Sequence, residues 1–279
     1  MVSPIEKAKR ISSNLPIISF ELNKTFSSSK GISKQKKRGL GEEFWDYKNY
    51  NFGDSIRNID WKKSAKMEDY VIKYNEVENS KRIWIWKDSS VSMNYKFYKN
   101  TESKLERATI LSIILLDIFL RSGEKVGIVG SKIGIKNGNE SFLDLSSAIL
   151  NDKCDISDKR IKKGDFVIFI SDFIDKINIT RKKLISLSNN TYKALLIQIL
   201  DPSELSFPFE GRKQFYDPKS GIHKLLNRSE KMRSIFQHKV KQHNDELEKI
   251  CKKLGWKFVR NITNESYNSI MNKIYNNFS

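Results

Sequence analysis

From residue 82 onward the chain alternates between short apolar runs and longer segments with apolar residues at helical spacing. The runs are rich in Ile, Val, Phe and Trp, which is typical of buried strands. Strands are expected at Ile83–Trp86, Val126–Val129, Phe166–Ile170, Ala194–Ile199 and Trp256–Val259. Helices are expected at Lys104–Arg121, Leu143–Leu150, Thr180–Ser188, within Leu225–Leu254, and at Tyr267–Asn276. This alternation predicts an α/β domain over residues 82–279, with a mostly parallel, Rossmann-like sheet covered by helices on both faces.

The first 81 residues have a different pattern. They begin with a short polar segment that predicts a helix, followed by the Ser-, Lys- and Gly-rich stretch Thr25–Arg38, which predicts a flexible linker. Between Glu42 and Glu78 aromatic residues are spaced irregularly among turn residues, and only Tyr70–Tyr74 has the pattern of a strand. We therefore expect residues 1–81 to form an N-terminal helix, a basic linker and an extended, loop-rich arm that packs on the core.

The charge of the chain is strongly positive, because 51 Lys and Arg face 33 Asp and Glu, for a formal net charge of +18. A basic domain is typical of proteins that bind nucleic acid or an anionic surface. The chain is also rich in Lys, Asn and Ile, and a biased composition of that kind raises the charge without specifying a partner. Its basic clusters lack interleaved aromatic residues, and no helix-turn-helix or RNP motif is present. Nucleic-acid or anionic-surface binding is therefore the alternative function and not the favoured one.

Cysteines and hydrophobic segments set further limits. Cys154 and Cys251 are too few and too far apart for a disulfide framework or a CxxC metal site. The N-terminus has no apolar run typical of a signal peptide. The most hydrophobic stretch, Ala108–Leu120, contains Asp117 and is shorter than the roughly 20 residues that span a bilayer. We expect a cytoplasmic protein without a transmembrane segment.

Common catalytic motifs are absent from the sequence. It contains neither a G-x-x-x-x-G-K-[ST] P-loop for nucleotide phosphates nor a G-x-S-x-G nucleophile elbow. The three histidines lie late in the chain, at His223, His238 and His243, and the last two fall on different faces of a helix. The sequence therefore predicts a protein that is not an enzyme. A Mg²⁺-dependent phosphohydrolase would lack an identifiable nucleophile or base.

Carboxylates and hydroxyls follow two of the expected strands. Asp88, Ser90 and Ser92 come directly after the first strand, and Asp172 follows the third. Ligands of an open α/β sheet bind beyond the carboxyl ends of its strands, where a turn can bring these side chains together. Their oxygen atoms suit Mg²⁺. The alternative is that the same side chains only cap helices and satisfy turns.

Several blocks of the chain resemble one bacterial family. They include Arg38-Gly39-Leu40-Gly41-Glu42-Glu43-Phe44, Gly53-Asp54-x-x-Arg57-x-Ile59-Asp60-Trp61, Trp84-Ile85-Trp86-x-Asp88-x-Ser90-x-Ser92-Met93, Ile170-Ser171-Asp172-Phe173 and Asp201-Pro202-x-Glu204. The chain thereby resembles the bacterial domain of unknown function 58 family (DUF58), from about Leu15 to the C-terminus. The resemblance implies a von Willebrand factor A-like fold for residues 82–279.

The same resemblance implies a site and a partner. The site would be a metal-ion-dependent adhesion site that holds Mg²⁺ with Asp88, Ser90 and Ser92 in its first loop and Asp172 in its third. The middle loop of such sites often supplies a Thr, in whose place this chain offers Ser141. Proteins of this kind are typically encoded with MoxR-type AAA+ ATPases, so the resemblance implies such an ATPase as the partner and a non-enzymatic adaptor role in protein or complex assembly. The positive charge would favour an acidic partner, which offers a Glu or Asp carboxylate to the ion.

Overall fold

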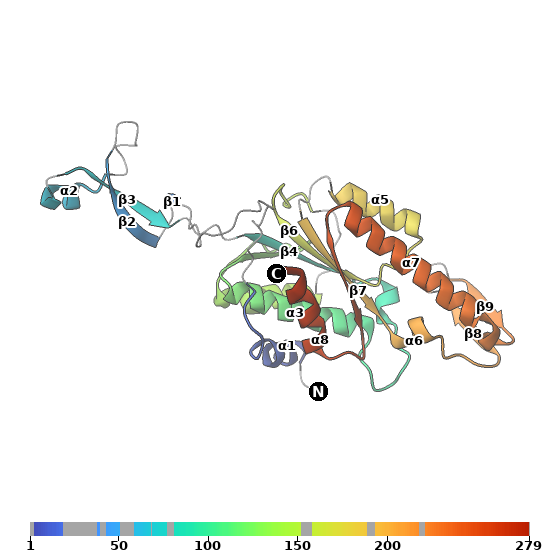
Figure 1. Ribbon diagram of the computed structural model, residues 1–279. Coiled ribbons are helices and arrows are strands. Elements are labelled where there is room, and N and C mark those ends of the chain that lie inside the picture. Colours follow the sequence, from blue (N-terminus) through green and yellow to red (C-terminus); the bar gives the residue numbers. More distant parts are fainter. Residues whose placement is uncertain are drawn as a thin grey trace. The chain divides into compact units, whose positions relative to one another are not determined.

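The computed structural model describes residues 3–18, 38–39, 43–50, 59–67, 69–76, 81–151, 158–188, 193–217 and 221–278. The chain divides into two compact units, one formed by Met1–Leu22 with Lys81–Ser279 and one formed by Asn23–Ser80 (Figure 1). The larger unit holds the α/β domain. The N-terminal helix belongs to this unit and not to the arm with which the sequence analysis groups it.

Five parallel strands form the central sheet of the larger unit. They are β4 (Arg82–Lys87), β5 (Lys125–Ile128), β6 (Phe166–Ser171), β7 (Lys193–Leu200) and β10 (Lys257–Ile262). Their order across the sheet is β10-β7-β6-β4-β5, and neighbours are parallel throughout. The predicted parallel sheet is confirmed, and each strand overlaps a predicted one.

Helices cover both faces of this sheet, as predicted (Figure 1). One face packs against α1 (Pro4–Ser12), α3 (Lys104–Arg121), α4 (Phe142–Asn151) and α8 (Tyr267–Phe278), and the other against α5 (Ile177–Ser188) and α7 (Arg233–Lys253). Successive side chains of a strand point to opposite faces, so β4 places Ile83 and Ile85 in the first core and Trp84 in the second. Gly127 of β5 leaves room for the Trp84 ring, since a Cβ there would lie 2.6 Å from it.

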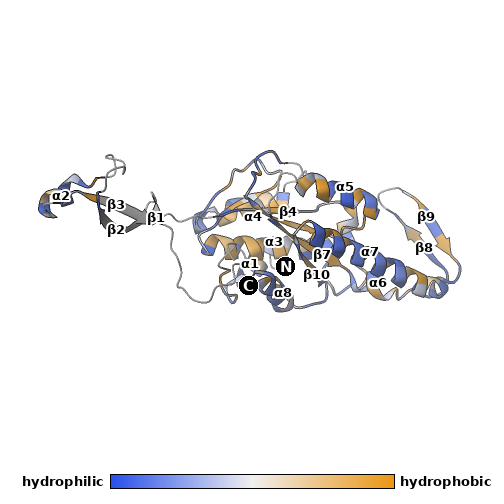
Figure 2. Cartoon of the chain, turned by 45° about the horizontal axis from the view of Figure 1, so that its top comes forward, coloured by the Kyte–Doolittle hydropathy of each residue, from blue (hydrophilic) through white to orange (hydrophobic). Residues whose placement is uncertain are grey.

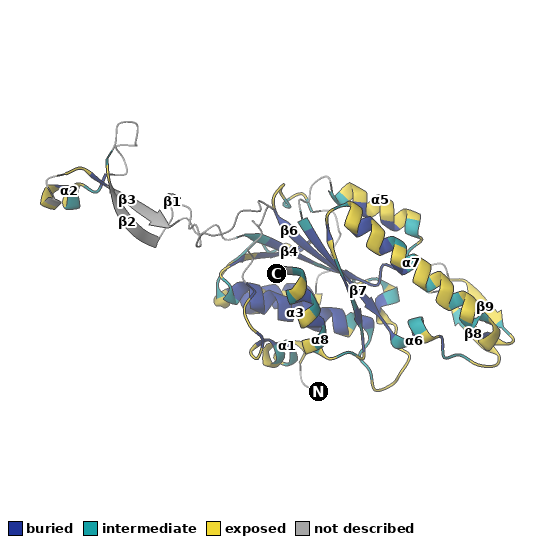
Figure 3. Cartoon of the chain, viewed as in Figure 1, coloured by how far each residue is buried: buried dark blue, intermediate teal, exposed yellow. Residues whose placement is uncertain are grey.

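The hydrophobic stretch that includes Ala108–Leu120 lies in α3, and all of these residues are buried. Figure 2 shows the apolar character of α3, and Figure 3 shows its burial. Ser103 caps the start of the helix by accepting a hydrogen bond from the Glu106 amide at 3.1 Å, while the Glu106 carboxylate accepts from the Ser103 amide at 2.7 Å. Within the described residues, no helix has the length and hydropathy needed to cross a membrane.

The N-terminal helix α1 packs on α3, which explains its place in the larger unit. Ala8 is fully buried in this contact. Arg121 of α3 donates a hydrogen bond of 2.7 Å to the Ser12 carbonyl, and Lys9 pairs with Asp117. Contacts of α1 therefore engage Asp117 and Arg121, two charged residues near the end of a largely apolar helix.

The smaller unit contains a short antiparallel sheet of order β1-β3-β2 and one helix. Its elements are β1 (Arg38–Gly39), β2 (Glu43–Asn49), α2 (Trp61–Met67) and β3 (Val71–Glu76). The strand predicted at Tyr70–Tyr74 is confirmed as β3. The sequence predicts irregular structure where β2 lies, and this prediction is wrong. A register shift between Phe44 and Asp46 interrupts the two-residue period of β2 and hides it in the sequence. Gly53, Asp54 and Arg57, like Cys154, lie outside the described residues.

A hairpin beyond α6 (Pro202–Ser206) is absent from the sequence prediction. It consists of β8 (Lys213–Tyr216) and β9 (His223–Leu226), so the long helix expected within Leu225–Leu254 begins at Arg233. The ring of Phe215 packs against Phe207 and Phe209, with centroid distances of 5.7 and 5.0 Å. Contacts between aromatic rings therefore fix this hairpin, whose two strands are largely exposed.

Candidate functional site

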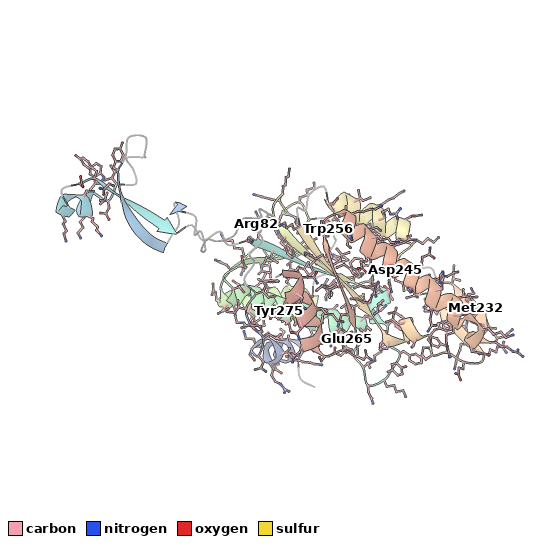
Figure 4. The ribbon with its side chains drawn as sticks, in the orientation of Figure 1. Arg82, Met232, Asp245, Trp256, Glu265 and Tyr275 are labelled. Atoms are coloured by element: carbon pink, nitrogen blue, oxygen red, sulfur yellow. The ribbon has the colours of Figure 1, made fainter. Side chains whose placement is uncertain are left out.

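The sheet changes its winding direction between β4 and β6. The chain leaves β4 through α3 toward β5 on one side, and leaves β6 through α5 toward β7 on the other. Such a switch point opens a crevice at the carboxyl ends of the strands, where ligands of α/β sheets bind. We call the loops that follow β4, β6 and β7 the carboxyl edge. In Figure 4, Arg82 and Trp256 mark the opposite, amino edge of the sheet, and Glu265 follows the carboxyl end of β10.

Asp88, Ser90 and Ser92 lie together in the loop after β4, which we call the first loop. The Asp88 amide donates to the Ile170 carbonyl of β6 at 2.9 Å, which fixes the loop at the switch point. One carboxylate oxygen of Asp88 accepts from the Ser90 amide at 2.7 Å, and the Ser90 and Ser92 hydroxyls are 3.0 Å apart. All three side chains are half-buried, so their oxygen atoms remain within reach of a ligand.

Ser171 is a member of this cluster that the sequence analysis does not single out. Its hydroxyl donates to the second carboxylate oxygen of Asp88 at 2.6 Å. Ser171 ends β6 and Asp172 follows it, and neighbouring residues of a strand point to opposite sides. That alternation is the signal that could have identified Ser171, because only one of the two side chains can face Asp88.

Asp172 has a different partner. Its side chain is 2% exposed, and one carboxylate oxygen accepts a hydrogen bond of 2.9 Å from the ammonium of Lys104, which is 1% exposed. The same ammonium donates to Glu204 of α6 at 2.7 Å. Lys104 and Glu204 are functional candidates that the sequence analysis misses, since they lie 68 and 100 residues from their partners along the chain. The only local signal is a lysine in the first turn of a helix that becomes apolar from Ala108 onward.

The charges of Lys104, Asp172 and Glu204 influence one another. Burial disfavours the charged form of Lys104, but Glu204 and Asp172 attract its ammonium, and the net result is a pKa above the usual lysine value. Burial raises the pKa of Glu204, and repulsion from the Asp172 carboxylate adds to this rise, against the attraction of Lys104. Lys104 is therefore a fixed positive charge beneath the carboxyl edge.

Ser141 lies in a short 3₁₀ turn, Asn139–Ser141, before α4. Its side chain is buried, and its hydroxyl donates to the Asn137 carbonyl at 2.9 Å. Among the described residues, no hydrogen bond joins Ser141 to the first loop. The structure thus gives its hydroxyl a local backbone acceptor.

The predicted Mg²⁺ ligands differ in how well they fit the ion. The first loop offers one carboxylate and two hydroxyls, all half-buried and hydrogen-bonded only to neutral groups, which suits a hard cation. Asp172 and Ser141 are buried and have other partners. Within the described residues, no group of three or more His, Cys, Asp or Glu side chains is arranged for a metal ion. The fit to Mg²⁺ is therefore confined to Asp88, Ser90 and Ser92.

The acidic loop after β7 has a structural role. Asp201 caps α6, since its carboxylate accepts from the Ser203 amide at 2.9 Å and from the Ser203 hydroxyl at 2.6 Å. Its other carboxylate oxygen accepts from the Phe97 amide at 3.2 Å. Asp201 therefore fixes the turn that presents Glu204 to Lys104.

Comparison with solved structures gives distant likenesses. The conserved hypothetical protein BatB from Bacteroides thetaiotaomicron is 15% identical, with 71% of this chain and 96% of that chain covered and a TM-score of 0.39. An aerotolerance-related membrane protein from Bacteroides fragilis, with multiple mutations to serines, is 16% identical, with coverage of 71% and 100% and the same TM-score. At this TM-score neither likeness bears on the function of the chain.

No curated protein matches the chain. The model of one family does match, over residues 46–246, which is more than half of the chain, and its description is a protein of unknown function, DUF58. This span includes the first loop, Asp172 and Lys104, and agrees with the resemblance carried by the sequence blocks. The chain therefore belongs to the DUF58 family.

Proposed function

We propose that this protein is a non-enzymatic interaction domain, an adaptor that binds a protein partner at the carboxyl edge of its sheet. The first loop carries the proposal, because Asp88, Ser90 and Ser92 form a partly exposed set of oxygen atoms at the switch point. In the described structure, the hydrogen bonds of these side chains involve only backbone amides and hydroxyls. Such a set of oxygen atoms suits the binding of a cation or of a partner's hydrogen-bonding groups.

We further propose that the first loop works as a von Willebrand factor A-like adhesion site. Asp88, Ser90 and Ser92 would hold a Mg²⁺ ion, and the ion would supply a positive charge that attracts a partner's carboxylate. The hydrogen bond from Ser171 supports this role, because it orients the carboxylate of Asp88.

The proposed partner is an acidic protein of the MoxR-type AAA+ ATPase class, which the adaptor would serve in protein or complex assembly. Membership of the DUF58 family and the net charge of +18 support this choice. A basic protein attracts an acidic partner at long range, which speeds association and selects against basic competitors.

The test measures binding of a purified MoxR-type ATPase from the same genome to the full chain by titration calorimetry, with Mg²⁺ and with a chelator. Asp88→Ala should weaken binding by about 30-fold, the effect of losing a 2 kcal/mol hot spot. The chelator should weaken the wild type by a similar factor and should have little further effect on Asp88→Ala.

A matched control is Asp144→Ala. Asp144 is an exposed acid on α4 that pairs with Lys136 at 2.6 Å, so its loss removes the same charge away from the first loop. We expect the affinity of this variant to equal that of the wild type. Equal binding by wild type and Asp88→Ala, with and without chelator, would contradict the adhesion mechanism.

The alternative function, binding to nucleic acid or an anionic surface, rests on one observation. Arg181, Lys182 and Lys183 are consecutive exposed residues on α5, and Lys183 pairs with the half-buried Asp175 at 3.1 Å. Such a cluster can bind phosphates in any sequence context. It contains no aromatic side chain on which a base could stack, so the interaction-domain proposal ranks first.

A further inference from the structure

Lys104 is a buried cation at the carboxyl edge. It is the first residue of α3, and its side chain is 1% exposed. A lysine in the first turn faces the positive end of the helix dipole, and burial adds the cost of removing its charge from water. The fold keeps this ammonium because strong partners surround it.

Two carboxylates from different loops supply those partners. Asp172 after β6 accepts from Lys104 at 2.9 Å, and Glu204 of α6 accepts at 2.7 Å. Tyr95, from the segment after the first loop, places its ring 5.6 Å from the ammonium and bonds through its hydroxyl to Ser203 at 2.9 Å. A single lysine thus joins the segments that follow β4, β6 and β7.

These contacts compete with a metal-binding role for Asp172. One of its carboxylate oxygens accepts from Lys104 and the other from the Ile174 amide at 3.2 Å. A divalent cation bound there would lie beside a buried ammonium, and like charges repel strongly where water is excluded. Asp88 differs, because its hydrogen-bond donors, the Ser90 amide and the Ser171 hydroxyl, are neutral.

We infer that Lys104 takes the place of a metal ion at Asp172: its ammonium neutralises Asp172 and Glu204 and holds the carboxyl edge together without a divalent cation. Asp172 is then a structural partner of Lys104 and neither a ligand nor a support of the ion, and any Mg²⁺ at this edge is bound by the first loop alone. The inference concerns the edge that the proposed function uses. Its test needs no partner, so the two proposals can fail separately.

The first experiment titrates the full chain with MgCl₂ by calorimetry. Asp172→Asn should bind Mg²⁺ as the wild type does, whereas Asp88→Asn should lose binding. If Asp172→Asn lowers the affinity by roughly tenfold or more, as expected for a ligand or its close support, the inference is wrong. A wild type that binds no Mg²⁺ would leave the inference standing and would contradict the metal part of the proposed function.

The second experiment compares melting temperatures in EDTA and in MgCl₂. The wild type should melt at the same temperature in both solutions, or any fall in EDTA should be absent from Asp88→Asn, which no longer binds the ion at the first loop. Lys104→Met keeps the length of the side chain but leaves the buried Asp172 and the half-buried Glu204 without their ammonium partner. Its melting temperature should therefore fall by on the order of 10 °C in EDTA. MgCl₂ should restore part of this loss, because Asp172 and Glu204 are then free to bind a cation.

Lys183→Met is the matched control, since it removes a lysine from an exposed ion pair with Asp175. It should melt within about 1 °C of the wild type in both solutions. An unchanged melting temperature for Lys104→Met would overturn the inference, as would a fall of the wild type in EDTA that Asp172→Asn abolishes and Asp88→Asn does not. If Lys104→Met does not fold, the Asp172→Asn titration still decides whether Asp172 contributes to Mg²⁺ binding.

Discussion

At the scale of single residues, Asp158 and Arg160 connect the segment before β6 to the loop after β5. Arg160 donates to Asp158 through its guanidinium and to the Ser131 and Ile133 carbonyls at 2.6 and 3.0 Å. The Gly130 amide donates to Asp158 at 2.9 Å. The hydrogen bonds from Arg160 and the backbone hold the pKa of Asp158 down, to about 2, against the effect of burial.

This lowered pKa predicts a pH-dependent effect of Asp158→Asn. The carboxylate is favoured in the folded state, so its contribution is present above the unfolded pKa of about 4 and is lost as the pH falls toward 2. Allowing for the partial exposure of Arg160, the variant should lose about 1 kcal/mol of unfolding free energy at pH 7. Urea unfolding at pH 7 and pH 2.5 measures this loss, and the difference between the two proteins should be smaller at the lower pH, where the carboxylate of the folded wild type begins to be protonated. If the two proteins differ by the same unfolding free energy at both pH values, the charge of the Asp158 carboxylate does not contribute to stability.

The parts of the candidate site that can be predicted are those whose residues lie close together in the sequence. Asp88, Ser90 and Ser92 lie within one turn, so their pattern after a strand is visible in the chain, and the structure brings them together. Lys104 meets its partners only through folding of segments that are far apart. No local pattern encodes such a contact, because burial of a charge becomes evident only when the neighbouring strands and helices are in place.

At the scale of elements, the contact between α1 and α3 leaves no space at Ala8, which is fully buried. Ala8→Leu should therefore destabilise the larger unit by about 1–3 kcal/mol, because the added atoms must displace residues of α3. Chemical denaturation measures this loss. Arg10→Ala, at an exposed position of the same helix, should stay within about 0.5 kcal/mol of the wild type. Equal stability of Ala8→Leu and the wild type would mean that α1 does not pack on α3 in solution.

Whether an element can be predicted from the sequence depends on whether its signals are local. The boundaries of α3 agree with the sequence because the Ser103 cap and the apolar run that follows are both local signals. The strands of the large sheet are predicted because burial on both faces requires continuous apolar runs. The hairpin of β8 and β9 is not predicted from the sequence, because its strands are largely exposed and Phe215 is held by an aromatic ring outside the hairpin. A strand of that kind has no periodic pattern of its own.

At the scale of the whole molecule, the net charge of +18 and the chemistry of the carboxyl edge have opposite character. The edge is built from carboxylates and hydroxyls, and the charge of the buried Lys104 is neutralised by Asp172 and Glu204. The excess positive charge therefore acts from the surface, as a long-range attraction for acidic groups. It sets the sign of a partner but does not identify the partner as nucleic acid.

The affinity for DNA at 150 mM NaCl distinguishes the two proposed functions. If the chain is an adaptor, its contact with a mixed-sequence DNA duplex is non-specific, and fluorescence anisotropy of the full chain should give a dissociation constant no tighter than about 1 µM at 150 mM NaCl. Exchange of Lys182 and Lys183 for Gln should weaken this binding further and reduce its salt dependence, because fewer counterions are released. Asp88→Ala should leave DNA binding unchanged. A dissociation constant of about 10 nM at that salt concentration, in the range of specific complexes, would reject the adaptor proposal in favour of nucleic-acid binding.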